Sequence, residues 1–200
     1  MMRGAGVTDY ARFAHEVLEA IGDRPISFEV CSDDAADMER QARSIAAWPG
    51  NVYVKIPITN TSGDSMAHLV KRLSADGIKV NVTALTTTQQ VASICPAFEK
   101  TVPGYVSLFA GRIADTGTDP VPAVREASSI LRTYPKLELI WASPREVLNM
   151  FQADEAGCDI ITMTEALLKK LPMIGKSLES VSLETVQMFY RDATASRLAP

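Results

Sequence analysis

Short segments rich in β-branched residues alternate with longer segments of helical periodicity along the whole chain. Strands are predicted at 26–31, 51–56, 79–83, 105–109, 137–142 and 159–162. Helices are predicted at 8–22, 35–48, 63–75, 87–95, 120–133, 144–153, 164–170 and 182–194. Such regular alternation implies βαβ crossovers and a parallel sheet. No linker or low-complexity stretch interrupts it, so we predict one α/β domain over residues 1–200.

Two architectures fit this alternation, a closed TIM-type (β/α) barrel and an open doubly wound sheet. No glycine-rich phosphate loop of the GxGxxG or Walker type follows any predicted strand, which weakens the open nucleotide-binding alternative. A barrel would place reactive residues at the carboxyl ends of the strands. Only six strands can be counted in the sequence, whereas a complete barrel of this type has eight.

Composition excludes several classes of partner. The net charge of -4 leaves no basic surface for nucleic acid or an anionic membrane, and no apolar run is long enough to span a bilayer. The N-terminus shows no signal-peptide core, and the histidines and acidic residues are too scattered to predict a metal site. The cysteines, Cys31, Cys95 and Cys158, form no CxxC pair, so we expect reduced, buried thiols in a cytoplasmic protein.

One lysine interrupts an apolar strand pattern, in the segment NVYVKIP at 51–57. Because strand side chains alternate between faces, Lys55 shares a face with Tyr53, and both faces of this run look buried. Burial lowers the pKa of an amine, and the neutral amine is the form that attacks a carbonyl. Lys55 is therefore a candidate Schiff-base lysine. The alternative is a structural lysine near a strand end whose ammonium reaches solvent.

Four other predicted strands also end in polar side chains, namely Glu29, Thr83, Ser107 and Ser143. Together with Lys55 they could face one barrel mouth, and polar groups that converge near a desolvated lysine make a plausible active site. Three of them have structural alternatives. Glu29 could be a solvated carboxylate, Thr83 an ordinary β-branched strand residue, and Ser143 the first residue of an S-x-x-E capping box.

Arg112 follows the strand at 105–109 and comes directly after Gly111. A glycine lets the backbone approach a ligand closely, and a guanidinium can bind a phosphate through two parallel hydrogen bonds. Arg112 is therefore a candidate phosphate ligand, with a salt-bridged surface arginine as the alternative.

Three motifs, in this order, resemble the transaldolase family: VYVKIP at 52–57, DGIKVNVTA at 76–84 and SLFAGRI at 107–113. The resemblance runs from about residue 5 to the C-terminal helix. It implies a (β/α)₈ barrel of the class I aldolase type. Members of this family transfer a dihydroxyacetone unit between sugar phosphates through a lysine Schiff base, without a metal or other cofactor.

The resemblance also assigns roles to residues. It implies that Lys55 is the Schiff-base lysine and that Glu29 and Thr83 hold the catalytic water. Five further positions are expected to contact substrate: Ser107, Arg112, Phe109, Ser143 and Asn81. Among these, Ser107 and Arg112 match the pair that binds the substrate phosphate. Phe109 and Glu29 match transaldolases, whereas the related fructose-6-phosphate aldolases, which are similar in length, typically carry tyrosine and glutamine there.

The chain departs from the family at its beginning. The family starts with a strand bearing a catalytic aspartate, followed by a second strand that ends in a Thr-Asn-Pro segment, and neither occurs here. Residues 1–7 resemble the sequence just after that segment. The resemblance therefore implies a barrel that is incomplete at its N-terminus, with two of its eight strands missing.

We predict a transaldolase of the pentose phosphate pathway, with sugar-phosphate substrates and a homo-oligomeric state. One alternative is a lyase of the fructose-6-phosphate aldolase type, in which water releases the three-carbon product. The other is a sugar-phosphate-binding remnant without turnover. The sequence leaves open the acceptor sugar, the oligomer size and the true N-terminus.

Overall fold

The computed structural model describes residues 7–196 and contains one parallel sheet. Its strands are β1 (Ile26–Glu29), β2 (Val52–Pro57), β3 (Val80–Leu85), β4 (Gly104–Leu108), β5 (Leu137–Trp141) and β6 (Ile160–Ile161). Their order in the sheet is the order in the sequence. A doubly wound sheet reverses its strand order at a switch point, whereas a barrel wall does not. The predicted TIM-type wall of six strands is therefore confirmed, and the open-sheet alternative is wrong.

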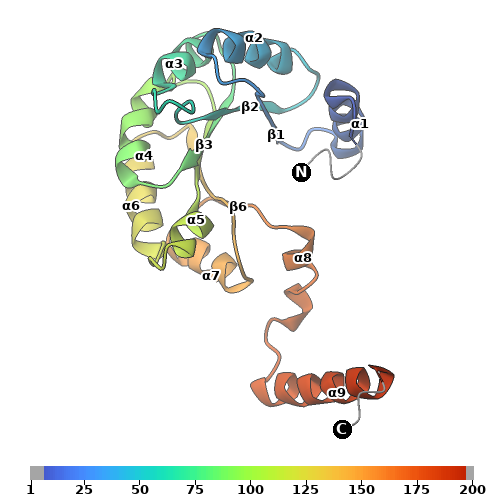
Figure 1. The fold of residues 1–200 in the computed structure, drawn as a ribbon. Coiled ribbons are helices and arrows are strands. Elements are labelled where there is room, and N and C mark those ends of the chain that lie inside the picture. The colour runs from blue at the N-terminus through green and yellow to red at the C-terminus, as the bar shows by residue number, and fades with distance from the viewer. Residues whose placement is uncertain (1–6, 197–200) are drawn as a thin grey trace. The chain divides into compact units, whose positions relative to one another are not determined.

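Helices follow the outer side of this curved sheet (Figure 1). They are α1 (Tyr10–Ile21), α2 (Ala35–Ala46), α3 (Ala67–Ala75), α4 (Thr88–Ile94), α5 (Ala110–Asp115), α6 (Val121–Leu131) and α7 (Leu148–Glu155), with a 3₁₀ turn η2 (Cys95–Ala97) after α4. Each βαβ crossover places its helix on the same side of the sheet. The opposite face, which we call the interior face, is left to the alternate strand residues.

Local side-chain hydrogen bonds explain several helix boundaries. Thr87 and Gln90 form a capping box at the start of α4, close to the predicted boundary. The prediction that a helix begins at residue 63 is wrong, because Asn60 accepts hydrogen bonds from the backbone of Ser62 and Asp64 and holds a turn there. The sequence also gave no sign of α5, which at six residues is too short to show helical periodicity.

Apolar side chains form two separate clusters on the two faces of the sheet. The larger cluster lies between the sheet and the helices and includes the fully buried Val54 and Ile56. The smaller one lies on the interior face and consists of Tyr53, Tyr105, Ile140 and Ala142, with Phe109 and Ile160 packed against it. The rings of Tyr53 and Tyr105 stack with centroids 4.0 Å apart. Burial there raises the pKa of the Tyr105 hydroxyl.

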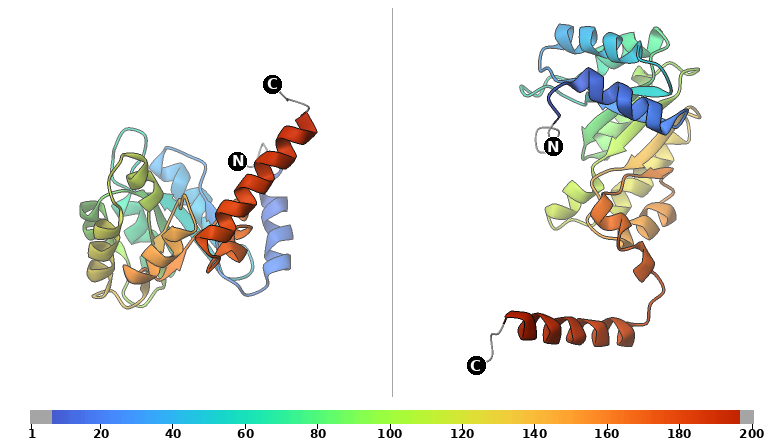
Figure 2. Two further views of the ribbon diagram at one scale, coloured as in Figure 1. Left: turned by 90° about the horizontal axis from the view of Figure 1, so that it is seen from below. Right: turned by 90° about the vertical axis from the view of Figure 1, so that its right-hand side faces the viewer.

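The chain divides into two compact units, Met1–Met163 and Thr164–Pro200. The second unit contains α8 (Glu165–Leu168), η3 (Leu171–Met173) and α9 (Leu178–Ser196). Figure 2 shows α9 as one continuous helix, which starts four residues before the predicted boundary. The single domain over residues 1–200 stays a prediction. Among the described residues, no helix combines the length and hydropathy that crossing a membrane requires.

The three cysteines are free thiols in different environments. Burial raises the pKa of the Cys95 thiol to about 12 and that of Cys158 to about 11. Cys31 is exposed, so the expectation of a buried thiol is wrong there. It lies in the loop after β1 rather than within the strand, and the loop carries it to the surface.

Candidate active site

Three predicted site residues lie side by side on the interior face. Lys55 of β2 is in register with Glu29 of β1 on one side and with Asn81 of β3 on the other. Neighbouring strands lie about 4.8 Å apart, so the three side chains start from adjacent positions in one row. The alternation of side chains along each strand places each residue on this face, and the register between the strands brings the three residues together.

Lys55 is half-buried, whereas its strand neighbours Val54 and Ile56 are fully buried. Within residues 7–196, its ammonium nitrogen makes no hydrogen bond or ion pair. Tyr53, two residues earlier on the same face, is buried beneath it. The amine is therefore partly shielded but accessible to a small substrate, and no neighbouring carboxylate is bound to it.

Glu29 ends β1 and is held through its backbone rather than its carboxylate. The hydroxyl of Tyr10, from α1, donates to the Glu29 carbonyl at 3.2 Å and accepts from the Glu29 amide at 3.0 Å. Partial burial raises the pKa of this tyrosine. The carboxylate itself is exposed beside Lys55, so it is free to act on protons at the lysine.

Thr83 ends the regular part of β3 and is 2% exposed. Its hydroxyl is buried and has no hydrogen-bond partner among the described residues. The pairing of β3 with β4 shifts between Val82 and Leu85, and Ala84 has a φ of 64°. A buried hydroxyl without a partner and a strained backbone both carry a cost, and both cluster at functional sites. These features favour a functional Thr83 over an ordinary strand residue.

Ser143 also has a positive φ, 63°, directly after β5. The alternative that it starts a helix is wrong, because α7 begins five residues later and has no side-chain cap. The Ser143 carbonyl instead lies against Gly111, where an added Cβ would come within 1.5 Å of its oxygen. Only glycine fits that approach, so α5 and the loop after β5 meet at this point.

Two arginines lie on these adjoining segments, Arg112 on α5 and Arg145 on the loop after β5. Arg112 is exposed on α5, and no ion pair to it occurs within residues 7–196. Arg145 donates through Nε to Asp115 at 2.9 Å and through its terminal nitrogen to the other carboxylate oxygen. Arg145, with a smaller effect from Arg112, lowers the pKa of Asp115. Sequence reasoning missed Arg145, although its place in Ser-Pro-Arg directly after a strand was a usable signal.

Ser107 and Phe109 take different positions on β4 and at its end. Ser107 is 3% exposed, and its hydroxyl donates to the side-chain carbonyl of Asn81 at 2.7 Å. That bond uses the only hydrogen of the hydroxyl, which counts against a role in donating to phosphate. Phe109 packs against the interior cluster. Its ring therefore lines the same face as Lys55 and offers no polar group there.

The wall of parallel strands, with its polar side chains at the carboxyl ends, is the arrangement of (β/α)-barrel enzymes. Residues 9–198 match the family described as transaldolase/fructose-6-phosphate aldolase. The chain therefore belongs to this family.

Several relatives support this assignment. A probable transaldolase 2 of Listeria monocytogenes is 37% identical over 164 residues, which cover 80% of this chain and 72% of that protein. A probable transaldolase of Thermoanaerobacter sp. is 32% identical over 186 residues, which cover 92% of this chain and 81% of the relative. A probable transaldolase of Caldicellulosiruptor saccharolyticus is 36% identical over 165 residues, covering 82% and 72%.

Proposed function

We propose that this chain is a transaldolase that moves a dihydroxyacetone unit between sugar phosphates through a Schiff base on Lys55. Membership of the family and the names of the relatives support this function. The observation that carries it is the row on the interior face, in which the accessible, unpaired Lys55 lies between Glu29 and Asn81. The pentose phosphate pathway follows from the family. A cytoplasmic location and a homo-oligomeric state are further parts of this proposal.

The reaction begins when the neutral amine of Lys55 attacks the carbonyl carbon of a ketose phosphate. A carbinolamine forms, and loss of water turns it into an iminium. Glu29 exchanges protons with the leaving water, which the hydroxyl of Thr83 helps to hold. The exposed carboxylate of Glu29 and the unpartnered hydroxyl of Thr83 suit these roles.

The carbon–carbon bond next to the iminium then breaks. Its electron pair moves into the iminium to give an enamine, the hydroxyl proton of the departing fragment passes to a water held by Glu29, and an aldose phosphate leaves. The enamine attacks the aldehyde of an acceptor, the new alkoxide takes that proton back, and the new carbon–carbon bond regenerates the iminium. Hydrolysis of the iminium releases the product and frees Lys55.

The phosphate of both donor and acceptor would lie at the adjoining ends of β4 and β5. Arg112 is free to bind an anion there, and Arg145 stands beside it, paired with Asp115. A guanidinium binds phosphate more specifically than a lysine because it offers two parallel donors. Ser143 reaches the same loops from β5, which supports its predicted place near the substrate.

The test is reductive trapping of the imine. The protein is incubated with fructose 6-phosphate and borohydride, and the modified peptide is located by mass spectrometry. We expect one adduct, on Lys55, which is abolished in Lys55→Ala. Lys71→Ala, which removes an exposed lysine from α3, is the matched control and should trap normally. An adduct on another lysine, or trapping that survives in Lys55→Ala, contradicts the mechanism.

A further inference from the structure

Three polar side chains from three strands, the half-buried Ser27 and the buried Asn81 and Ser107, are linked by hydrogen bonds on the interior face. The amide nitrogen of Asn81 donates to the hydroxyl oxygen of Ser27 at 2.9 Å, and the hydroxyl of Ser107 donates to the amide oxygen of Asn81 at 2.7 Å. Asn81 is 4% exposed and Ser107 is 3% exposed. Both ends of the Asn81 amide are therefore held, and its orientation is fixed from two sides.

The bond between Ser27 and Asn81 crosses the lysine strand. Ser27 belongs to β1 and Asn81 to β3, and β2 lies between them. Ser27 is in register with Tyr53 of β2, and Asn81 is in register with Lys55. The hydrogen bond therefore passes over the interior face of β2 between the side chains of Tyr53 and Lys55. It therefore lies on that face next to the strand position of Lys55.

We propose that Ser27 is a positioning residue of the active site that acts through Asn81. This proposal rests on the proposed function of Lys55. By accepting a hydrogen from the amide nitrogen, Ser27 keeps the amide carbonyl turned toward Ser107. Without it, rotation of the amide can present the nitrogen to Ser107 instead, which reverses the donor and acceptor groups on one side of Lys55. Ser27 thus fixes the polarity of the surface that a substrate meets beside the lysine.

The chain offers a matched control. Ser128, on α6, is a buried serine whose hydroxyl donates to the carbonyl of Gly157 at 2.7 Å, outside the interior face. Ser128→Ala and Ser27→Ala each remove one hydroxyl and one partly buried hydrogen bond. A difference between the two variants therefore reports the position of Ser27 and not the general cost of losing such a bond.

Two readouts test the proposal. The first is the rate of borohydride trapping on Lys55 with fructose 6-phosphate, and the second is hydrogen exchange of the Asn81 side-chain amide by NMR, assigned by its loss in Asn81→Asp. In Ser27→Ala we expect trapping to slow about 3- to 10-fold, the range expected from one hydrogen bond, and amide exchange to accelerate. Ser27→Thr, which keeps the hydroxyl, should restore both, and Ser128→Ala should leave both unchanged.

Each other outcome overturns the proposal. It is wrong if Ser27→Ala traps as fast as Ser128→Ala, if its Asn81 amide exchanges as in the wild type, or if Ser27→Thr is as impaired as Ser27→Ala. A wild-type protein that gives no adduct on Lys55 overturns the proposed function itself, and the role of Ser27 with it. The two failures are therefore distinguishable.

Discussion

Phe109 is the residue that bears most directly on the choice between transfer and release of the three-carbon unit. Its ring packs against the interior cluster and, unlike a tyrosine, carries no hydroxyl that could activate a water against the enamine. We expect the wild type to transfer dihydroxyacetone in preference to releasing it. Phe109→Tyr adds such a hydroxyl and should raise the released share by up to ~10²-fold, the lower range for a positioned acid–base group.

The measurement is the rate of free dihydroxyacetone production with and without an acceptor aldehyde. Phe98→Tyr, at a buried phenylalanine that packs in the outer cluster, is a control for the added hydroxyl. A wild-type protein that releases dihydroxyacetone as fast as it transfers it would favour the aldolase alternative over the transaldolase.

Arg112 provides a second prediction at the residue scale. Because its guanidinium is exposed and unpaired among the described residues, Arg112→Ala should weaken phosphorylated substrates by roughly 2–4 kcal/mol, the scale of losing a charge-assisted pair. The binding of unphosphorylated fructose should weaken far less. Asp115→Asn should instead strengthen the binding of phosphorylated substrates, since it frees Arg145 from its ion pair to bind the anion. Equal losses for both substrates would show that Arg112 is structural.

The sequence predicted the site unevenly at this scale. Alternation within one strand placed Lys55 and Glu29 on the interior face, because a period of two depends only on local sequence. The contacts of Ser27 and Arg145 escaped prediction. The contact of Ser27 depends on the register between strands, and that of Arg145 depends on which segments meet after the strands. The residue pattern within a single strand predicts neither.

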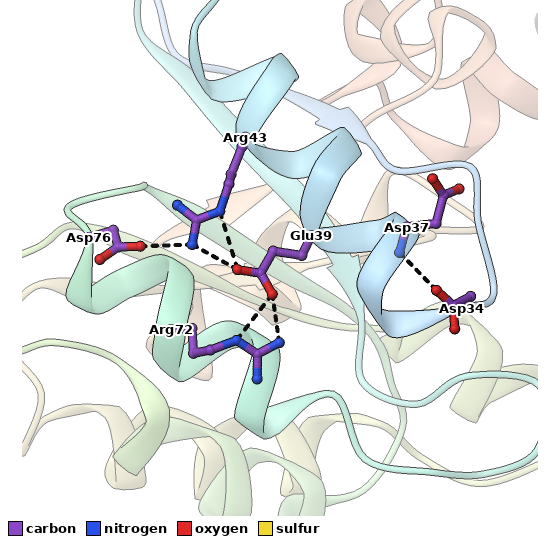
Figure 3. A network of polar contacts seen from close by, with 6 residues as sticks. All are labelled: Asp34, Asp37, Glu39, Arg43, Arg72 and Asp76. Carbon is purple, nitrogen blue, oxygen red and sulfur yellow. Dashed lines mark hydrogen bonds and ion pairs between the residues drawn. The ribbon is translucent and has the colours of Figure 1, made fainter.

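Helices α2 and α3 are joined by a network of exposed charges (Figure 3). Glu39 of α2 accepts from Arg43 on its own helix and from Arg72 of α3, each at 2.7 Å, and Arg43 also reaches Asp76. Arg72 and then Arg43 lower the pKa of Glu39. A carboxyl with a lowered pKa in the folded state stabilises the fold above its unfolded pKa, and that contribution is lost as pH falls through the folded value.

We therefore predict that Glu39→Gln lowers the free energy of unfolding at pH 7 by roughly 0.5–1 kcal/mol, the small contribution of solvent-exposed pairs. The difference from wild type should shrink as pH falls below about 4.5, the ordinary value for this carboxyl, and vanish once pH is below its lowered pKa in the folded state. Urea unfolding at several pH values measures it. Glu16→Gln, which removes a more exposed pair with one partner, is the control and should have a smaller effect. A difference that does not shrink as pH is lowered would contradict an electrostatic origin.

Element boundaries were predictable where the terminating signal is local. The start of the helix at residue 87 and the order of strands and helices were predicted from periodicity, and the structure places the Thr87 cap of α4 at that boundary. The alternative in which Ser143 caps a helix is wrong although the S-x-x-E pattern is present. Close packing of the Ser143 carbonyl on Gly111 holds that segment in a non-helical turn. Tertiary contact thus overrides a weak local preference.

The whole sheet has two unpaired edges within residues 7–196. β1 pairs only with β2, and β6 pairs only with β5. Regular alternation predicted this parallel wall, because each crossover is a local βαβ unit. Alternation within these residues does not predict which other strands or chains cover the edges at β1 and β6. Unpaired edges expose backbone donors and acceptors, which are templates for association with other chains.

We therefore predict that the 200-residue chain self-associates or precipitates, and that sedimentation velocity shows species larger than a monomer at micromolar concentration. Its cleavage of sugar phosphates should be weak, because Glu29 is the only carboxylate in the row beside Lys55 and the aspartate expected from the family resemblance is not in that row.

An N-terminal extension that carries the strand aspartate and the Thr-Asn-Pro segment should pair with both edges. It should raise turnover by ~10²–10⁴-fold, the contribution of a positioned acid–base group. The same extension with the aspartate changed to asparagine should restore solubility but not turnover, which separates the two effects. A 200-residue chain that sediments as a monomer and has full transaldolase turnover would contradict both the association through unpaired edges and the need for a second carboxylate.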